Sequence, residues 1–116
     1  MAKSIKPSIA AIKREVNHGI KGHFKSLADE FGADNFDPES LSENIGVFFA
    51  LAAHHPQEDI MAAFPSVHSG QDIQRMDAEA RGWIGNDMHL ALTVFGSART
   101  LNISKPDMGY QDADFG

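Results

Sequence analysis

The feature that most constrains the fold is the regular spacing of apolar residues near the start of the chain. Seven of them follow one another at steps of three or four residues, the period of an amphipathic helix that buries one side. Pro7 suits the first turn of such a helix, and Gly32 suits its C-terminal end. The pattern predicts a helix over residues 7–31, with a kink or a close backbone approach at Gly19 or Gly22. The apolar residues are Ile9, Ile12, Val16, Ile20, Phe24, Leu27 and Phe31.

Three further helices are predicted from the same kind of spacing, each with its own start and stop signal. Asp37 is placed to cap a second helix, which Pro56 ends. Pro56 also opens a short third helix, which Pro65 ends. Ser69 can cap a fourth helix, in which apolar residues keep helical spacing as far as Leu101.

The C-terminal part of the fourth helix has a second interpretation. Asp87 falls on its apolar stripe, and from Met88 to Val94 apolar and polar residues alternate. Alternation of this kind is typical of a half-buried strand. The predicted fold class is all-α, a compact bundle of about four helices with an extended C-terminal tail. The alternative is an α+β fold with a strand near residues 87–95.

The helical domain is expected to span residues 1–103, and residues 104–116 are expected to form an acidic tail without a regular period. The tail contains Tyr110 and Phe115. One interpretation is a mobile polar terminus. The other is an extended arm that seats both aromatic rings on a neighbouring subunit, since aromatic residues contribute strongly to interfaces. Trp83, the sole tryptophan, is expected to anchor the core.

Composition excludes several classes of function. The chain has no cysteine, which rules out disulfides, thiolate metal sites and a cysteine nucleophile. The basic N-terminal region has an apolar run of only four residues, at Ile9–Ile12, and elsewhere the longest run is seven, at Val47–Ala53. Neither run resembles a secretory signal or a membrane span. We therefore expect a cytoplasmic protein with no membrane partner.

Charge is distributed very unevenly along the chain. Residues 1–25 carry a formal charge of +5 and residues 26–116 carry −11, within a net charge of −6. Such a separation favours association between a basic surface and an acidic one, on a second copy or on another protein. We expect a homo-oligomer. The predicted partner-binding residues are Arg14, His18, Lys21 and Lys25 in the first helix, with Tyr110 and Phe115 in the tail.

Histidines suggest a second hypothesis. The chain has six, and His54 and His55 stand close to Glu58, a combination of ligands that divalent first-row metals accept when the groups converge. Adjacent side chains diverge by about 100° on a helix, and Pro56 separates the histidines from the acid. The alternative interpretation is a helix C-terminus, where imidazolium favours the negative end of the dipole.

These observations favour a non-enzymatic protein–protein interaction or assembly protein, such as an adaptor, an inhibitor, or a virion or phage accessory component. We expect no cofactor and no catalytic residues, because neither a phosphate-binding glycine loop nor a nucleophile elbow is present. The first alternative is a small-molecule or metal-binding protein or enzyme that uses the histidines. The second is nucleic-acid binding through the basic N-terminal helix. Two features disfavour it: the chain as a whole has a net negative charge, and the polar side of that helix carries no aromatic residue to stack on bases.

Overall fold

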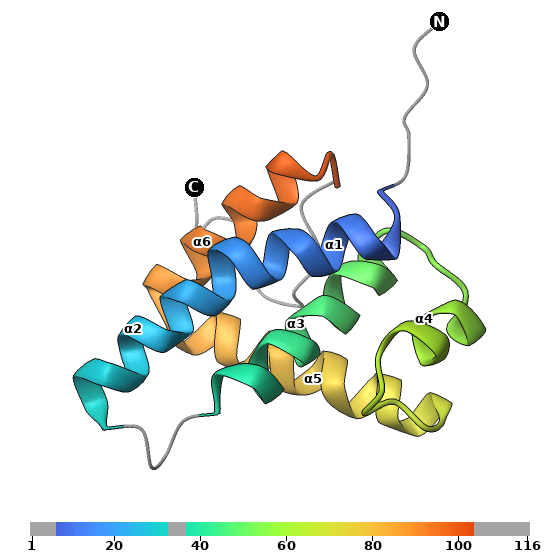
Figure 1. Cartoon of the computed structure of the whole chain (residues 1–116), viewed down its shortest axis with the longest axis horizontal. Helices are drawn as coiled ribbons and strands as arrows, with labels where there is room; N and C mark the ends of the chain where they lie inside the picture. Colours follow the sequence, from blue (N-terminus) through green and yellow to red (C-terminus); the bar gives the residue numbers. More distant parts are fainter. Residues whose placement is uncertain (1–6, 33–36, 104–116) are drawn as a thin grey trace, which may run out of the picture.

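The computed structural model describes residues 7–32 and 37–103. Within those two ranges every regular element is helical and no strand forms, which confirms the predicted all-α fold class (Figure 1). The predicted tail, residues 104–116, lies outside them. The elements are α1 (Ile9–Glu15), the π-helical segment η1 (Val16–Ile20), α2 (Lys21–Phe31), α3 (Pro38–Ala52), α4 (Gln57–Ala63), α5 (Gly70–Asn86) and α6 (Met88–Thr100).

The first three elements run into one another without a break, and together they are called the long N-terminal helix here (Figure 1). The predicted helix over residues 7–31 is confirmed, although it begins slightly later than expected. The side chain of Ser8 caps it by accepting a hydrogen bond from the Ala11 N–H at 3.1 Å, so Pro7 precedes the cap. The helix ends at Gly32, whose φ of 94° is readily adopted only by glycine.

The irregularity in this helix is a π-turn. The Lys21 N–H donates to the carbonyl oxygen of Val16, five residues earlier. The expected close backbone approach at a glycine is absent. A Cβ at Gly19 would lie 3.9 Å from the Ser97 Oγ of α6, which is ordinary van der Waals contact, and a Cβ at Gly22 would meet nothing within 4 Å.

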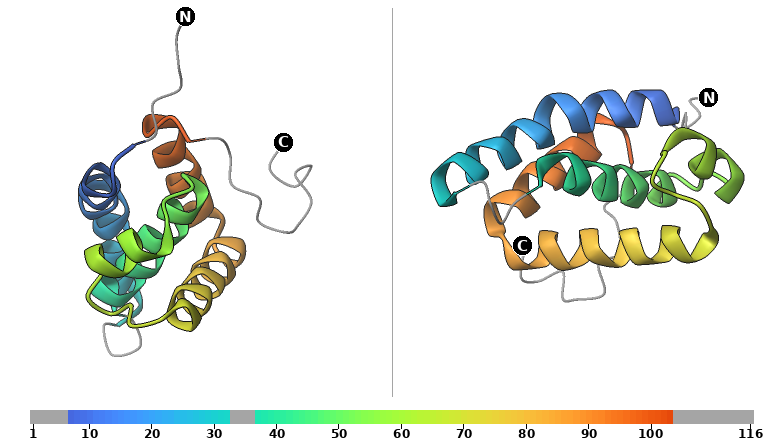
Figure 2. Two further views of the ribbon diagram at one scale, coloured as in Figure 1. Left: turned by 90° about the vertical axis from the view of Figure 1, so that its right-hand side faces the viewer. Right: turned by 60° about the horizontal axis from the view of Figure 1, so that its bottom comes forward.

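Helix α3 is the centre of the fold, with the long N-terminal helix on one side and α5 on the other (Figure 2). As predicted, Asp37 caps it: its Oδ1 accepts the N–H groups of Glu39 and Ser40 at 3.2 and 3.4 Å. Nine of its fifteen residues are buried. Burying a large apolar side chain contributes about 1.5–3 kcal/mol relative to leaving it exposed. Those most fully buried are Phe24, Phe48, Phe49, Ile12, Ile20, Ile45, Ile60, Ile84, Leu90, Val47 and Val94.

The boundaries of the next helix also follow the sequence signals. Pro56 stands immediately before α4, which gives way to extended backbone at Phe64. Ser69 caps α5 by accepting a hydrogen bond from the Asp72 N–H at 3.3 Å. None of the helices in residues 7–32 and 37–103 combines the length and apolar character that crossing a bilayer requires.

The fourth predicted helix is wrong in its extent, because the structure divides it into α5 and α6. Asp87 is extended rather than helical, with φ −127° and ψ 109°, and its side chain caps α6 by accepting the Leu90 N–H at 3.0 Å. The alternative strand near residues 87–95 is wrong as well. Met88 and Leu92, which suggested alternation, are 56 % and 60 % exposed. The residues that α6 buries keep helical spacing instead, and they are Leu90, Ala91, Val94, Ser97 and Ala98.

The expectation that Trp83 anchors the core is also wrong, because this residue is 44 % exposed. The buried stripe of α5 runs at steps of three, four and four residues, and position 83 falls beside it rather than on it. Its neighbour Ile84 is fully buried in its place. The stripe consists of Ile73, Met76, Ala80 and Ile84.

Candidate functional site

The four basic residues predicted to bind a partner lie along the long N-terminal helix at steps of four, three and four residues. Arg14, His18 and Lys25 are exposed, and these three are called the basic face. Lys21 is half-buried, and its ammonium forms an ion pair with the carboxylate of Glu39 on α3. The structure therefore places three of the four residues where a partner could reach them, and it gives the fourth a role within the chain.

The basic face has no partner within the described part of the chain, in contrast to the arginines of α5. None of the Arg14, His18 and Lys25 side chains makes a hydrogen bond or an ion pair there. The arginines of α5 are neutralised along their own helix. Arg75 lies 3.3 Å from Asp72 and 3.8 Å from Glu79, and Arg81 lies 2.9 Å from Asp77.

The other predicted residues are placed as follows. Tyr110 and Phe115 lie outside the described residues, so their part in binding stays a prediction. His54 and Glu58 are exposed, whereas His55 is half-buried and its Nε2 donates to the Pro7 carbonyl oxygen at 2.6 Å. Among the described residues no three histidine or acidic side chains gather closely enough to hold a metal ion. The structure thus does not bring His54, His55 and Glu58 together as a metal centre. His55 instead forms a hydrogen bond that holds the residues just before the long N-terminal helix.

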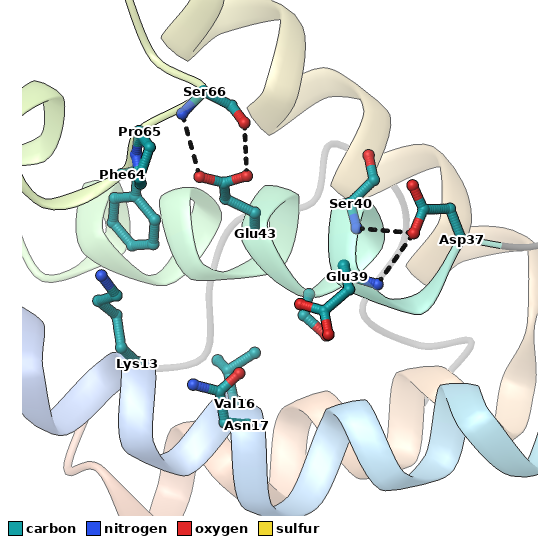
Figure 3. Close-up of a pocket in the computed structure, with 11 residues that line it drawn as sticks. Lys13, Val16, Asn17, Asp37, Glu39, Ser40, Glu43, Phe64, Pro65 and Ser66 are labelled. Carbon is teal, nitrogen blue, oxygen red and sulfur yellow. Dashed lines mark hydrogen bonds between the residues drawn. The ribbon is translucent and has the colours of Figure 1, made fainter.

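Sequence reasoning missed an open groove of about 590 Å³ between the long N-terminal helix and the first half of α3. Figure 3 shows its lining residues. Lys13, Val16 and Asn17 form one wall. A polar stripe of α3 forms the other, with Glu39 and Glu43 one turn apart and Ser42 between them in sequence. The four-residue spacing of Glu39 and Glu43 shows that both lie on one side of α3, but nothing in the sequence indicates which helix faces that side.

One end of the groove is closed by the loop that follows α4. Glu43 accepts two hydrogen bonds from Ser66, from the Oγ at 2.7 Å and from the backbone N–H at 3.2 Å (Figure 3). The Nζ of Lys13 donates to the Ala63 carbonyl oxygen at 2.6 Å and lies 5.2 Å from the centroid of the Phe64 ring. The loop is therefore held by both walls, which gives the groove a fixed shape.

Charge in the groove is mainly negative. Asp37, Glu39 and Glu43 supply three carboxylates, of which Glu39 is paired with the ammonium of Lys21, and Lys13 supplies one ammonium to the lining. Ser42 is only 5 % exposed, and its Oγ finds no hydrogen-bond partner within the described residues. A buried hydroxyl without a partner costs about 1–3 kcal/mol, and the Ser42 Oγ has almost no surface open to the groove.

The arrangement offers recognition by charge on two separate surfaces, a cationic one on the long N-terminal helix and an anionic one in the groove. No protein-family model, curated protein or solved structure matches the chain.

Proposed function

We propose that this protein acts by binding another protein, as an assembly or adaptor component rather than an enzyme, and that a second copy of itself is a partner. The observation that carries this proposal is the basic face, three aligned and exposed groups with no partner among the described residues. The chain as a whole has an excess of acids, so a second copy supplies the opposite charge.

A specific pairing of two copies follows from the positions of the charges. Asp29 is exposed, has no partner among the described residues and follows Lys25 by four positions, so it lies on the same side of the helix. Two copies that pack antiparallel would bring Arg14 of each against Asp29 of the other. The same two-fold axis would bring His18 against Lys25, whose ammonium can donate to a neutral imidazole.

The centre of this pairing falls between Lys21 and Gly22. A Cβ at Gly22 would meet nothing within 4 Å, so the glycine leaves room for a second helix to approach. Ion pairs at an exposed interface contribute about 0–1 kcal/mol each and are screened by salt. We therefore expect a weak dimer that dissociates as the salt concentration rises.

Charge exchange tests the proposal. Arg14→Glu places two acids opposite each other, and so it should shift the protein toward monomer in sedimentation velocity at low salt. Asp29→Arg should do the same by opposing two arginines. The double variant Arg14→Glu with Asp29→Arg restores opposite charges, and we expect it to recover the dimer.

The matched control is Arg99→Glu on α6, because Arg99 is also exposed and also without a partner among the described residues. It changes the net charge as Arg14→Glu does, but it leaves the proposed interface intact. Equal effects of the two single substitutions would mean that net charge governs association. A double variant that stays monomeric would argue against the Arg14–Asp29 pairing.

A further inference from the structure

We propose that one side of α6 is a docking surface, and that its occupant is the tail of the same chain, residues 104–116. The surface is a row of side chains at steps of four, three and four residues, and it is called the α6 stripe. It consists of Met88, Leu92, Phe95 and Arg99. The α6 stripe shares no residue with the basic face or with the groove, so this interaction is separate from the proposed pairing of two copies.

The α6 stripe leaves apolar surface open to solvent. Met88 and Leu92 are exposed and lie one turn apart on α6, and Phe95 is partly buried in the same row. The exposed large apolar side chains of the described residues are Trp83, Met88 and Leu92, which fall within residues 83–92. Single exposed apolar residues are ordinary on a protein surface, whereas several in one row are typical of an interaction site.

The position of the α6 stripe keeps it away from the long N-terminal helix. Ser97 marks the side of α6 that meets this helix, since its Oγ would lie 3.9 Å from a Cβ at Gly19 of η1. At about 100° per residue, position 97 is about half a turn around α6 from Met88. A segment bound to the α6 stripe therefore leaves the contact between α6 and the long N-terminal helix unchanged.

Charge at one end of the α6 stripe complements that of the tail. Arg99 is exposed, and its side chain has no partner among the described residues. It stands at the end of the α6 stripe nearest to the tail, which carries three aspartates against one lysine. Asp107 is the first of these aspartates. Because opposite charges fix the register of a contact, we place Asp107 against Arg99.

The end of α6 already turns the chain. Asn102 has a φ of 63°, in the left-handed region, and the Ile103 N–H donates to the carbonyl oxygen of Ala98 at 2.9 Å. This hydrogen bond across five residues is typical of a helix that stops and changes direction. Ile103 is buried, so the tail starts from a fixed point just beyond α6.

The lengths of the tail and of α6 agree with this register. An extended chain advances about 3.3 Å per residue and a helix about 1.5 Å per residue. With Asp107 opposite Arg99, Tyr110 lies about 10 Å further along an extended tail, and Leu92 lies about 10 Å back along α6. The register therefore places the Tyr110 ring on the exposed apolar part of the α6 stripe, where an aromatic ring buries the most surface.

The tail of the same molecule has an advantage over the tail of a second copy. Two partners joined by a short stretch of chain meet at an effective concentration of about millimolar. A second copy in dilute solution reaches the α6 stripe at a far lower concentration. We therefore expect docking within one chain.

Disulfide trapping in the full chain tests the docking, because the natural chain has no cysteine. Gly96→Cys places a thiol beside the α6 stripe, where a Cβ would meet nothing within 4 Å. Met108→Cys places the second thiol next to Asp107, opposite position 96 in the proposed register. Gly82→Cys with Met108→Cys is the matched control, since position 82 is equally open but lies on α5. Under mild oxidation, we expect the Gly96→Cys pair to form a disulfide within one chain about tenfold faster than the control pair.

Substitutions on α6 separate docking from mere proximity. Added to the Gly96→Cys pair, Leu92→Asp places a charge in the apolar part of the α6 stripe, and Arg99→Glu opposes Asp107 with a like charge. Both positions are exposed, so the melting temperature should change little while the disulfide forms about tenfold more slowly. His89→Asp is the control, because His89 is exposed on α6 but lies outside the α6 stripe, and it should leave the rate unchanged.

A fast disulfide within one chain that Leu92→Asp slows and His89→Asp does not would support the docking. Equal rates for the Gly96→Cys and Gly82→Cys pairs would overturn it, as would an unchanged rate in both Leu92→Asp and Arg99→Glu. A disulfide-linked dimer as the main product would also overturn it, because the tail of a second copy would then occupy the α6 stripe. None of these results bears on the Arg14–Asp29 pairing, which is tested by charge exchange on another surface.

Discussion

The ring of Phe64 lies directly against the backbone of Gly46: a Cβ at position 46 would be 2.7 Å from the Cε1 of Phe64. Real Cβ atoms essentially never come this close to another heavy atom. Phe64 is only 3 % exposed and its ring also lies beneath the ammonium of Lys13, so it has little freedom to move aside. The absence of a side chain at position 46 is therefore what allows the loop after α4 to close the groove.

Gly46→Ala should destabilise the protein by about 1–3 kcal/mol, the usual cost of overpacking, even though alanine is the better helix former by about 1 kcal/mol. Gly82→Ala is the matched control, because a Cβ there would meet nothing within 4 Å. It should raise stability by up to about 1 kcal/mol. Urea unfolding measures both, and stabilisation by Gly46→Ala would contradict the packing described for Phe64.

Phe24→Ala should cost about 3–5 kcal/mol, since this side chain is fully buried. Trp83→Ala removes a larger side chain from a position that is 44 % exposed, and we expect a clearly smaller loss. The comparison uses the same urea unfolding assay. If Trp83→Ala lowered the free energy of unfolding more than Phe24→Ala does, Trp83 would contribute more to the core than its exposure indicates.

Asp87→Ala should destabilise the protein by about 1 kcal/mol, because it removes the side-chain acceptor for the Leu90 N–H at the start of α6. Asp87→Asn keeps an acceptor with nearly equal capping strength, so its stability should stay close to that of the wild type. Thermal unfolding compares the two. Equal losses from both substitutions would show that the charge of Asp87 matters and its cap does not.

Asp72 should contribute a pH-dependent part of the stability. A hydrogen bond from the His68 backbone N–H, at 2.8 Å, and one from Arg75, at 3.3 Å, lower the pKa of Asp72 below its ordinary value. A lowered native pKa stabilises the fold above the ordinary aspartate pKa of about 3.9, and this contribution is lost as the pH falls through the native value.

Urea midpoints at about pH 6 and about pH 3 measure this contribution. Asp72→Asn should show a smaller decrease between the two pH values than the wild type does. Asp59→Asn is the control, since the carboxylate of Asp59 is exposed and has no partner among the described residues, and this variant should keep the wild-type decrease. An unchanged decrease in Asp72→Asn would exclude the proposed role.

Much of the fold could be predicted because its signals are local. The period of the first apolar stripe gives the long N-terminal helix, and Asp37, Pro56 and Ser69 mark starts that the structure confirms. The break between α5 and α6 at Asp87 was missed because its local signal is ambiguous. An aspartate on an apolar stripe reads equally well as an interruption within one helix or as the cap of the next, and only its extended backbone distinguishes them.

The groove could not be predicted because its parts are distant in the sequence. Lys13, Ser42 and Phe64 belong to three separate segments, and no periodicity within one segment indicates what will face it. The exposure of Trp83 was also missed, because a shift of one residue along α5 decides whether Trp83 or Ile84 faces the core. The basic face, in contrast, could be predicted because its residues lie on a single helix. The ion pair between Lys21 and Glu39 could not, because it joins two helices.

The most direct measurement of the proposed self-association uses a single cysteine, which the natural chain lacks. Gly22→Cys places a thiol beside the proposed two-fold axis, where the two copies of the residue would come within disulfide range. Gly82→Cys is the control, because it has equally open surroundings on another helix. Under mild oxidation at low salt, we expect Gly22→Cys to form a disulfide-linked dimer much faster than Gly82→Cys, with the difference falling as salt is added. Equal rates for the two variants would contradict antiparallel pairing through the long N-terminal helix.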